Sequence, residues 1–239
     1  MKKILSIAFL IIFTNCVISQ EFTARVGFNS ANLNISGVDF LLESDFNEDF
    51  EDDEIEPIED VEPLPLPGFH IGGDVSFPIN DFLSMRTGVV LNYRGTRIEE
   101  EINMLFVNIE IDRDIRLFYI DIPLQGKVNY QLDDDLELFG LLGIYNAFGL
   151  FGKINTEIAA SGFIDFEDSD EEDVRWGPDE NEDFLRRYDF GLSFGGGIEY
   201  DRFELSAQYQ FGLRNISSFQ QNDVGAYNRL LNISLAYKF

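Results

Sequence analysis

Residues 231–239 close the chain with the sequence Leu-Asn-Ile-Ser-Leu-Ala-Tyr-Lys-Phe. Apolar and polar residues alternate strictly, and the apolar set ends in Tyr237 and Phe239. A repeat of two residues is the period of a β-strand whose two faces meet different surroundings. The segment therefore predicts a C-terminal strand with one wholly apolar face.

The same alternation recurs along the chain, and a further segment, 136–148, is apolar on both faces. The other alternating segments are 21–29, 69–77, 83–94, 118–130, 188–200 and 203–213. Short turns and long gaps separate them in strict alternation, which is typical of an antiparallel up-and-down barrel. We predict an all-β, eight-stranded barrel of this kind, in which 136–148 supplies the eighth strand.

One hairpin departs from the simple pattern. In the gap of about 95–116, Ile109 and Ile111 have the opposite parity to Phe118 and Ile120. We expect a β-bulge near Ile115 to restore the register.

The charges on the two faces indicate a transmembrane barrel. The apolar faces of the seven clear strands carry no Asp, Glu, Lys or Arg, whereas the opposite faces carry five cations and five anions. Unpaired buried charge is costly, so a narrow lumen needs such a balance. With the single histidine, the predicted lumen residues are Arg25, His70, Asp74, Arg86, Arg94, Asp121, Lys127, Asp189, Glu199, Glu204 and Lys238. Because eight strands leave room for little more than side chains, we expect a plugged lumen.

Aromatic residues gather near both ends of the predicted strands, as expected at two membrane–water interfaces. The last strand ends in Phe239, with Tyr237 on the same face. We predict that these two residues form the insertion signal through which barrel-insertion machinery recognises the edge strand.

The N-terminus has the layout of a secretory signal peptide. A basic start is followed by an apolar run over 4–13 and a polar, small-residue exit. We predict a cleaved signal peptide, 1–19, and a barrel domain, 20–239, exported to the cell outer membrane. Cys16 leaves a lipid-modified N-terminus open as an alternative, although Asn15 before it suits that processing poorly.

The net charge is −27, from 44 acidic and 17 basic residues. Thirteen of the acidic residues lie between Asp39 and Glu62, and eleven lie between Asp165 and Asp183. Blocks of like charge repel one another and stay solvated, so we predict long acidic outer loops at about 30–67 and 149–187. The charge also excludes nucleic acid as a partner, because phosphate binding requires Lys and Arg.

These blocks offer oxygen ligands suited to Ca²⁺ or Mg²⁺. The weak candidates are Asp52, Asp53, Glu54, Asp168, Asp170 and Glu172. No segment has the twelve-residue calcium-loop pattern, so we expect loosely bound Ca²⁺ at most and no other cofactor.

No catalytic group is predicted. His70 is the only histidine, and Asp74 lies four residues along an extended strand, about 13 Å away, which is too far for a hydrogen-bonded dyad. We therefore expect a protein that is not an enzyme.

Several loose motifs resemble a known family. They are Arg25-Val26-Gly27-Phe28-Asn29, Tyr119-Ile120-Asp121-Ile122-Pro123-Leu124, the glycine-rich run 190–197, Tyr209-Gln210-Phe211-Gly212-Leu213-Arg214-Asn215-Ile216 and the closing strand. The chain is similar to the small outer-membrane β-barrel domain proteins of Bacteroidetes-type bacteria often called PorT-like. The resemblance implies an outer-membrane barrel; the family's name member is tied to protein secretion, a role we do not carry over.

The leading hypothesis is a non-enzymatic outer-membrane barrel that presents acidic extracellular loops to cations, a partner protein or the cell surface. One alternative is an accessory subunit of an envelope or secretion machine, with envelope proteins as partners. A second alternative is a narrow channel. Under each hypothesis the partners include outer-membrane lipid and the barrel-insertion machinery.

Overall fold

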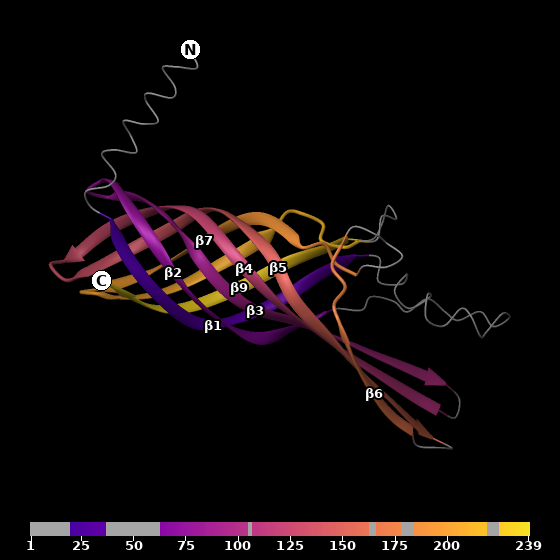
Figure 1. Cartoon of the computed structure of the whole chain (residues 1–239). Coiled ribbons are helices and arrows are strands. Elements are labelled where there is room, and N and C mark those ends of the chain that lie inside the picture. The colour runs from indigo at the N-terminus through magenta and orange to yellow at the C-terminus, as the bar shows by residue number, and fades with distance from the viewer. Residues whose placement is uncertain (1–19, 37–62, 105–106, 163–165, 178–183, 219–224) are drawn as a thin grey trace, which may run out of the picture.

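Eight strands close into a ring in the computed structural model (Figure 1), which describes residues 20–36, 63–104, 107–162, 166–177, 184–218 and 225–239. The ring consists of β1 (Glu21–Ser36), β2 (Leu64–Asn80), β3 (Leu83–Met104), β4 (Val107–Asp133), β5 (Leu136–Gly162), β7 (Tyr188–Tyr200), β8 (Phe203–Gly212) and β9 (Gly225–Lys238). Each strand pairs antiparallel with its neighbours, and β1 pairs with β9 to close the cylinder. The prediction of an eight-stranded antiparallel up-and-down barrel, including a strand at 136–148, is confirmed.

Three tight turns join β2 to β3, β4 to β5 and β7 to β8 at one end of the cylinder. In the first, the side-chain oxygen of Asn80 accepts hydrogen bonds from the backbone N–H groups of Phe82 and Leu83, at 3.1 and 2.9 Å. In the third, Asp201 adopts a φ of 54°, a left-handed conformation that Asp tolerates better than most residues. Thr23 pairs with Lys238 at this same end of the cylinder. The start of β1 and the end of β9 therefore both lie beside the short turns.

The outer wall is apolar between two bands of aromatic rings. Rings stack from strand to strand across β2–β5: Phe69 lies 5.3 Å from Tyr93, Tyr93 lies 4.7 Å from Phe118, and Phe118 lies 4.4 Å from Phe151. At the short-turn end, Tyr237 contacts both Phe203 and Phe239 edge to face. On β4, twelve residues separate Phe118 from Tyr130, which at a tilt of about 40° corresponds to roughly 30 Å, the thickness of a bilayer core.

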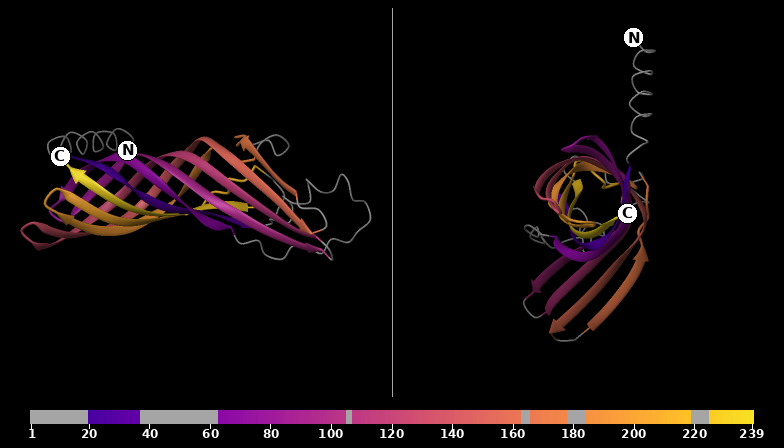
Figure 2. Two further views of the ribbon diagram at one scale, coloured as in Figure 1. Left: turned by 90° about the horizontal axis from the view of Figure 1, so that it is seen from below. Right: turned by 90° about the vertical axis from the view of Figure 1, so that its left-hand side faces the viewer.

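Three ring strands, β3, β4 and β5, continue past the outer aromatic band as a projecting sheet (Figures 1 and 2). A ninth strand, β6 (Phe166–Asp173), pairs only with the outer half of β5. The expected loop at 149–187 is therefore wrong for much of its length, because the acidic block forms an edge strand there. The expected loop at 30–67 is shortened, because β1 reaches Ser36 and β2 begins at Leu64; residues 37–62 lie outside the described part of the chain.

The bulge expected near Ile115 is also wrong. The β3–β4 pairing runs without a register shift from Arg94–Leu117 to the hairpin tip. The shift lies on β5 instead, at Leu150, between the pairs Phe118–Phe151 and Tyr119–Gly149. The opposite parity of Ile111 needs no bulge. Ile111 is buried on the inner face of the hairpin, at a level where the outer face meets water and no longer lipid.

The signal-peptide prediction concerns residues 1–19, which lie outside the described part of the chain. Among the residues described, there is no helix of the length and apolarity needed to cross a membrane.

Candidate functional site

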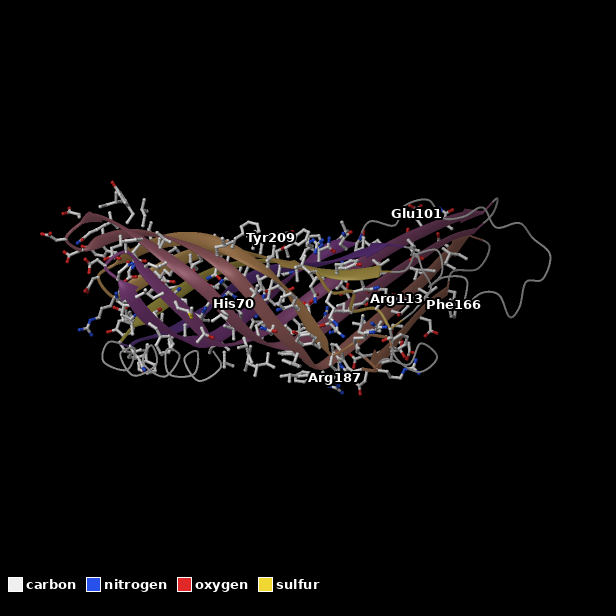
Figure 3. The ribbon with its side chains drawn as sticks, turned by 90° about the horizontal axis from the view of Figure 1, so that it is seen from above. His70, Glu101, Arg113, Phe166, Arg187 and Tyr209 are labelled. Atoms are coloured by element: carbon white, nitrogen blue, oxygen red, sulfur yellow. The ribbon has the colours of Figure 1, made fainter. Side chains whose placement is uncertain are left out.

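Alternate residues of the ring strands point into the cylinder. Ten of the eleven predicted lumen residues are buried, and Lys238 is partly buried at the short-turn end. Figure 3 places His70 within the ring. The buried ten are Arg25, His70, Asp74, Arg86, Arg94, Asp121, Lys127, Asp189, Glu199 and Glu204.

The cluster nearest the short turns joins three cations to two carboxylates. Arg86 donates to both oxygens of Glu204, at 2.7 and 2.5 Å. Lys127 Nζ lies 2.8 Å from Glu199 and 3.3 Å from Glu204, and Lys238 completes the cluster by pairing with Glu199. These contacts link β3, β4, β7, β8 and β9. The ion pairs therefore connect strands on opposite sides of the barrel.

A second layer contains a forked pair. The guanidinium of Arg25 on β1 donates two hydrogen bonds to the carboxylate of Asp74 on β2, with Nε 2.6 Å from Oδ2. His70 Nε2 hydrogen-bonds to Ser234 Oγ on β9 at 2.7 Å. His70 Nδ1 has no hydrogen-bond partner among the described residues. The His70–Ser234 contact therefore joins β2 to β9, the two strands that flank β1.

The uppermost polar layer centres on Arg94. Its guanidinium pairs with Asp121 and lies 3.8 Å from Asp189. Asp189 also accepts hydrogen bonds from the Tyr145 hydroxyl at 2.9 Å and from the Asn228 amide at 2.8 Å. Two buried carboxylates are thus held by one arginine and by neutral donors from two further strands.

The alternation of charges did not reveal the aromatic residues of the lumen. Phe139 and Tyr145 point inward from β5, and Lys127 Nζ lies 4.4 Å from the centre of the Phe139 ring. A Cβ atom at Gly197 would lie 2.6 Å from Cζ of Phe139, which explains why this position on β7 is glycine. The sequence feature that indicates these residues is the run 136–148, which is apolar on both faces. Phe139 and Tyr145 belong to the inner face of this strand, which is why that face is not polar.

An apolar cap lies at the outer end of the lumen. It consists of Leu33, Leu117, Tyr119, Tyr145, Ala147, Ile154, Val174, Leu185, Ile216 and Ala226, with Ile115, Trp176 and Phe184 packed against it. A Cβ atom at Gly149 would lie 2.3 Å from the ring of Trp176, so the ring can cover β5 only because residue 149 is glycine. Arg186 N–H donates to the carbonyl of Ile216 at 2.7 Å, which ties the β6–β7 connection to the β8–β9 connection.

The projecting sheet carries most of the charge that is described outside the lumen. Asp114 accepts hydrogen bonds from Arg97 at 2.6 Å and from Arg116 at 3.0 Å. Lys153 on β5 pairs with Glu171 on β6. The hydrogen bond from Arg97 is the main cause of a lowered pKa for Asp114, and burial opposes it.

The metal candidates are not assembled into a site in the described part of the chain. Asp168, Asp170 and Glu172 alternate along β6, so neighbouring carboxylates are about 7 Å apart. Asp52, Asp53 and Glu54 lie outside the described residues. Within the described ranges, no group of three or more His, Cys, Asp or Glu side chains could hold a metal ion.

The Arg25–Asp74 pair gives a direct stability prediction. Replacing Arg25 by Met should destabilise the barrel by about 3–5 kcal/mol, because Asp74 is left buried and unpaired. The double variant R25M/D74N should recover much of this loss, because neither charge remains. Urea unfolding in lipid vesicles measures both, with Lys153→Met on the exposed pair as a control that should change nothing measurable. Additive losses in the double variant would contradict the pairing.

Asp114 gives a prediction on pH. Its pKa is lower in the folded hairpin, so its pairing stabilises the hairpin above the ordinary Asp pKa of about 3.9 and is lost as the pH falls through the lowered value. Hydrogen exchange of the hairpin amides, corrected for intrinsic rates, should show lost protection between about pH 5 and pH 2. Asp114→Asn should remove most of this change, whereas Asp112→Asn, a matched change on the same strand, should keep it. Identical profiles for the two variants would count against the Asp114 bridge.

A family model described as "Outer membrane protein beta-barrel domain" matches residues 18–218. Similar solved structures include Ail, the attachment invasion locus protein of Yersinia pestis, with 16% identity, a TM-score of 0.37, and coverage of 93% of this chain and 100% of that one. Neisserial surface protein A has 13% identity, a TM-score of 0.41 and coverages of 92% and 99%. OprG from Pseudomonas aeruginosa has 11% identity, a TM-score of 0.40 and coverages of 92% and 96%. No curated protein matches the chain.

The aromatic bands, the apolar outer wall and the ionic lumen are features of a membrane barrel, and the family match covers most of the same residues. The chain therefore belongs to the family of outer-membrane proteins with a β-barrel domain, and it is a small barrel whose strands cross the outer membrane.

Proposed function

We propose that this protein is a non-enzymatic anchor that holds an acidic β-sheet outside the outer membrane for a cationic protein partner. The observation that carries the proposal is the continuation of β3, β4 and β5 beyond the outer aromatic band, where β6 joins them (Figure 1). On β4, eleven residues separate Phe118 from Val107, a length of about 36 Å along the strand.

The charge of this projecting sheet favours a cationic partner. Residues 97–104, 107–116, 152–162 and 166–173 contain thirteen acidic and four basic side chains. The strand β6 alone has six acidic residues among its eight, and all eight are exposed. Among the described strands, β6 forms an edge of the sheet, with backbone groups on one side that an added strand could pair with.

A partner surface fits these carboxylates better than one tightly held ion. The acidic groups are spread along β6 at intervals of about 7 Å, so several separated Lys or Arg side chains can each meet one of them. Calcium would bind loosely to the same surface as part of a diffuse cation atmosphere.

The lumen supports an anchor rather than a channel or an enzyme. Ion pairs occupy it at three levels, and the apolar cap lies at its outer end. His70 is enclosed among them, with Ser234 as its hydrogen-bond partner. An accessory subunit of an envelope machine remains a hypothesis compatible with this proposal, since such a machine would supply the partner.

A narrower family assignment is also proposed. The motifs quoted from the sequence, above all the closing strand and the glycine-rich run 190–197, favour a place among the PorT-like barrel proteins. No secretory role is assigned with it.

Surface labelling tests the presentation of the sheet. Ser169→Cys on β6 should react with a membrane-impermeant maleimide on intact cells, because β6 lies beyond the outer aromatic band. Asp134→Cys, in the β4–β5 turn, is the matched control and should react only after the outer membrane is permeabilised. The reverse pattern would show that the sheet faces the periplasm.

Binding of a cationic probe tests the function. A lysine-rich peptide of about eight residues should bind the full barrel in detergent, and D168N/D170N/E172Q should weaken this binding severalfold. The control D133N/D134N/D135N removes the same number of charges at the short-turn end and should leave the affinity unchanged. Fluorescence anisotropy of the labelled peptide measures both, and equal losses in the two variants would overturn the proposal.

A further inference from the structure

The cations outside the lumen are not distributed evenly. The described chain has ten Lys and Arg residues besides the five of the lumen. Six of these ten lie close above the outer aromatic band. We call them the basic belt: Arg97, Arg116, Lys153, Arg187, Arg214 and Arg229. In a chain with a net charge of −27, this concentration at one level of the barrel calls for a physical reason.

The aromatic rings fix the height of the belt. Arg116 lies two residues beyond Phe118 on β4, and Lys153 lies two residues beyond Phe151 on β5. At the rise and tilt of such strands, this spacing corresponds to about 5 Å above the band, the level of lipid headgroups. Arg97 lies four residues beyond Tyr93, about 10 Å above the band.

The remaining three belt residues are tied to the band itself. Arg214 lies over the ring of Tyr188 at 4.9 Å, and Arg229 lies over the ring of Phe211 at 3.6 Å. Arg187 donates to the carbonyl oxygens of Gly149 and Leu150, and Figure 3 shows it at the outside of the barrel. These contacts hold guanidinium groups beside the lipid-facing wall.

The belt has an excess of positive charge. Arg97 and Arg116 share the carboxylate of Asp114, Arg97 also lies 3.8 Å from the carboxylate of Glu99, and Lys153 is paired with Glu171. Among the described residues, the contacts of Arg187, Arg214 and Arg229 are to carbonyl oxygens and aromatic rings, with no ion-pair partner. Guanidinium groups with donors to spare are well suited to phosphate, which they bind in a forked manner.

The opposite end of the barrel provides the contrast. The turns there carry Asp133, Asp134, Asp135 and Asp201, and Arg202 is their one described cation. Arg202 also lies at an aromatic band, where it donates to the Tyr237 hydroxyl at 3.3 Å. The positive charge outside the lumen is therefore concentrated at the outer level, and a ligand restricted to the outer leaflet accounts for this asymmetry.

We propose that the basic belt binds the headgroup phosphates of phosphorylated glycolipids in the outer leaflet. The belt would then hold the barrel at a fixed depth, while the acidic sheet is repelled by the same phosphates and points away from the membrane. This inference concerns the lipid around the barrel and does not depend on the partner proposed for the sheet.

Thermal unfolding in vesicles of defined composition tests the proposal. The full barrel is refolded into zwitterionic vesicles that contain bisphosphorylated lipid A or its dephosphorylated form, and its midpoint is followed by heat-modifiable migration. We expect the midpoint to rise by several degrees with the phosphorylated lipid only. The variant R187Q/R214Q/R229Q should lose most of this rise, because each arginine near an anionic surface contributes about fivefold in affinity.

Arg202→Gln is the matched control, since it removes an exposed arginine at the other aromatic band, and it should keep the full rise. An equal rise with dephosphorylated lipid, or an undiminished rise in the triple variant, would overturn the proposal. An equal rise with millimolar inorganic phosphate in purely zwitterionic vesicles would also overturn it, because the site would then bind free phosphate. Should the triple variant fail to fold, the comparison of the two lipids with the unmodified chain decides alone.

Discussion

Charge pairing inside the lumen is the constraint on which the rest of the structure depends. Arginine and lysine side chains buried in a membrane barrel cannot be neutralised by water, so each needs a carboxylate within reach. Arg86 with Glu204, Arg25 with Asp74 and Arg94 with Asp121 supply these contacts at three levels. Arg25–Asp74 and Arg94–Asp121 join neighbouring strands, whereas Arg86–Glu204 joins β3 to β8 on the opposite side of the lumen. The outer wall is thereby free to be wholly apolar.

The same strands are surrounded by lipid in their lower part and by water in their upper part, and the outer aromatic band marks the boundary. Below it, Ile122 is exposed towards lipid, while Asp121 faces the lumen. Above it, Ile111 is buried on the inner face and Asp112 is exposed on the outer one. Water outside the projecting sheet reverses which face has to be apolar, although the strand does not change its parity. This reversal also explains how the chain can be strongly acidic and still contain a neutral set of lumen ions.

Much of this architecture could be predicted from local pattern. Period-two alternation located the ring strands, and the segregation of ions to one face identified the lumen residues that the structure buries. The limits were of two kinds. The alternation at Ile109 and Ile111 suggested a bulge near Ile115, because the pattern alone cannot show where the solvent changes. The acidic block at 165–173 suggested a loop, because charge repulsion was weighed without the pairing that β5 offers to β6.

The ions of the lumen could be predicted from the sequence, whereas the residues of the apolar cap could not. Trp176 and Leu185 reach the outer end of the lumen through a connection whose path is set by tertiary contacts with Gly149 and Ile216. No local repeat encodes such a contact. The basic belt was hidden for a similar reason, since its residues come from four strands and two connections and meet only at one height on the closed cylinder.

The orientation of the two faces is the central claim, and paramagnetic relaxation tests it most directly. With a spin label near the end of the lipid acyl chain, the methyl signals of Val26, Leu124 and Ile233 should be strongly broadened, because these side chains are exposed on the outer wall. The methyl signals of Leu117, Ile216 and Leu230 should persist, because these side chains are buried. Broadening of the second set with sharp signals from the first would show that the apolar wall does not face lipid, and would contradict the account.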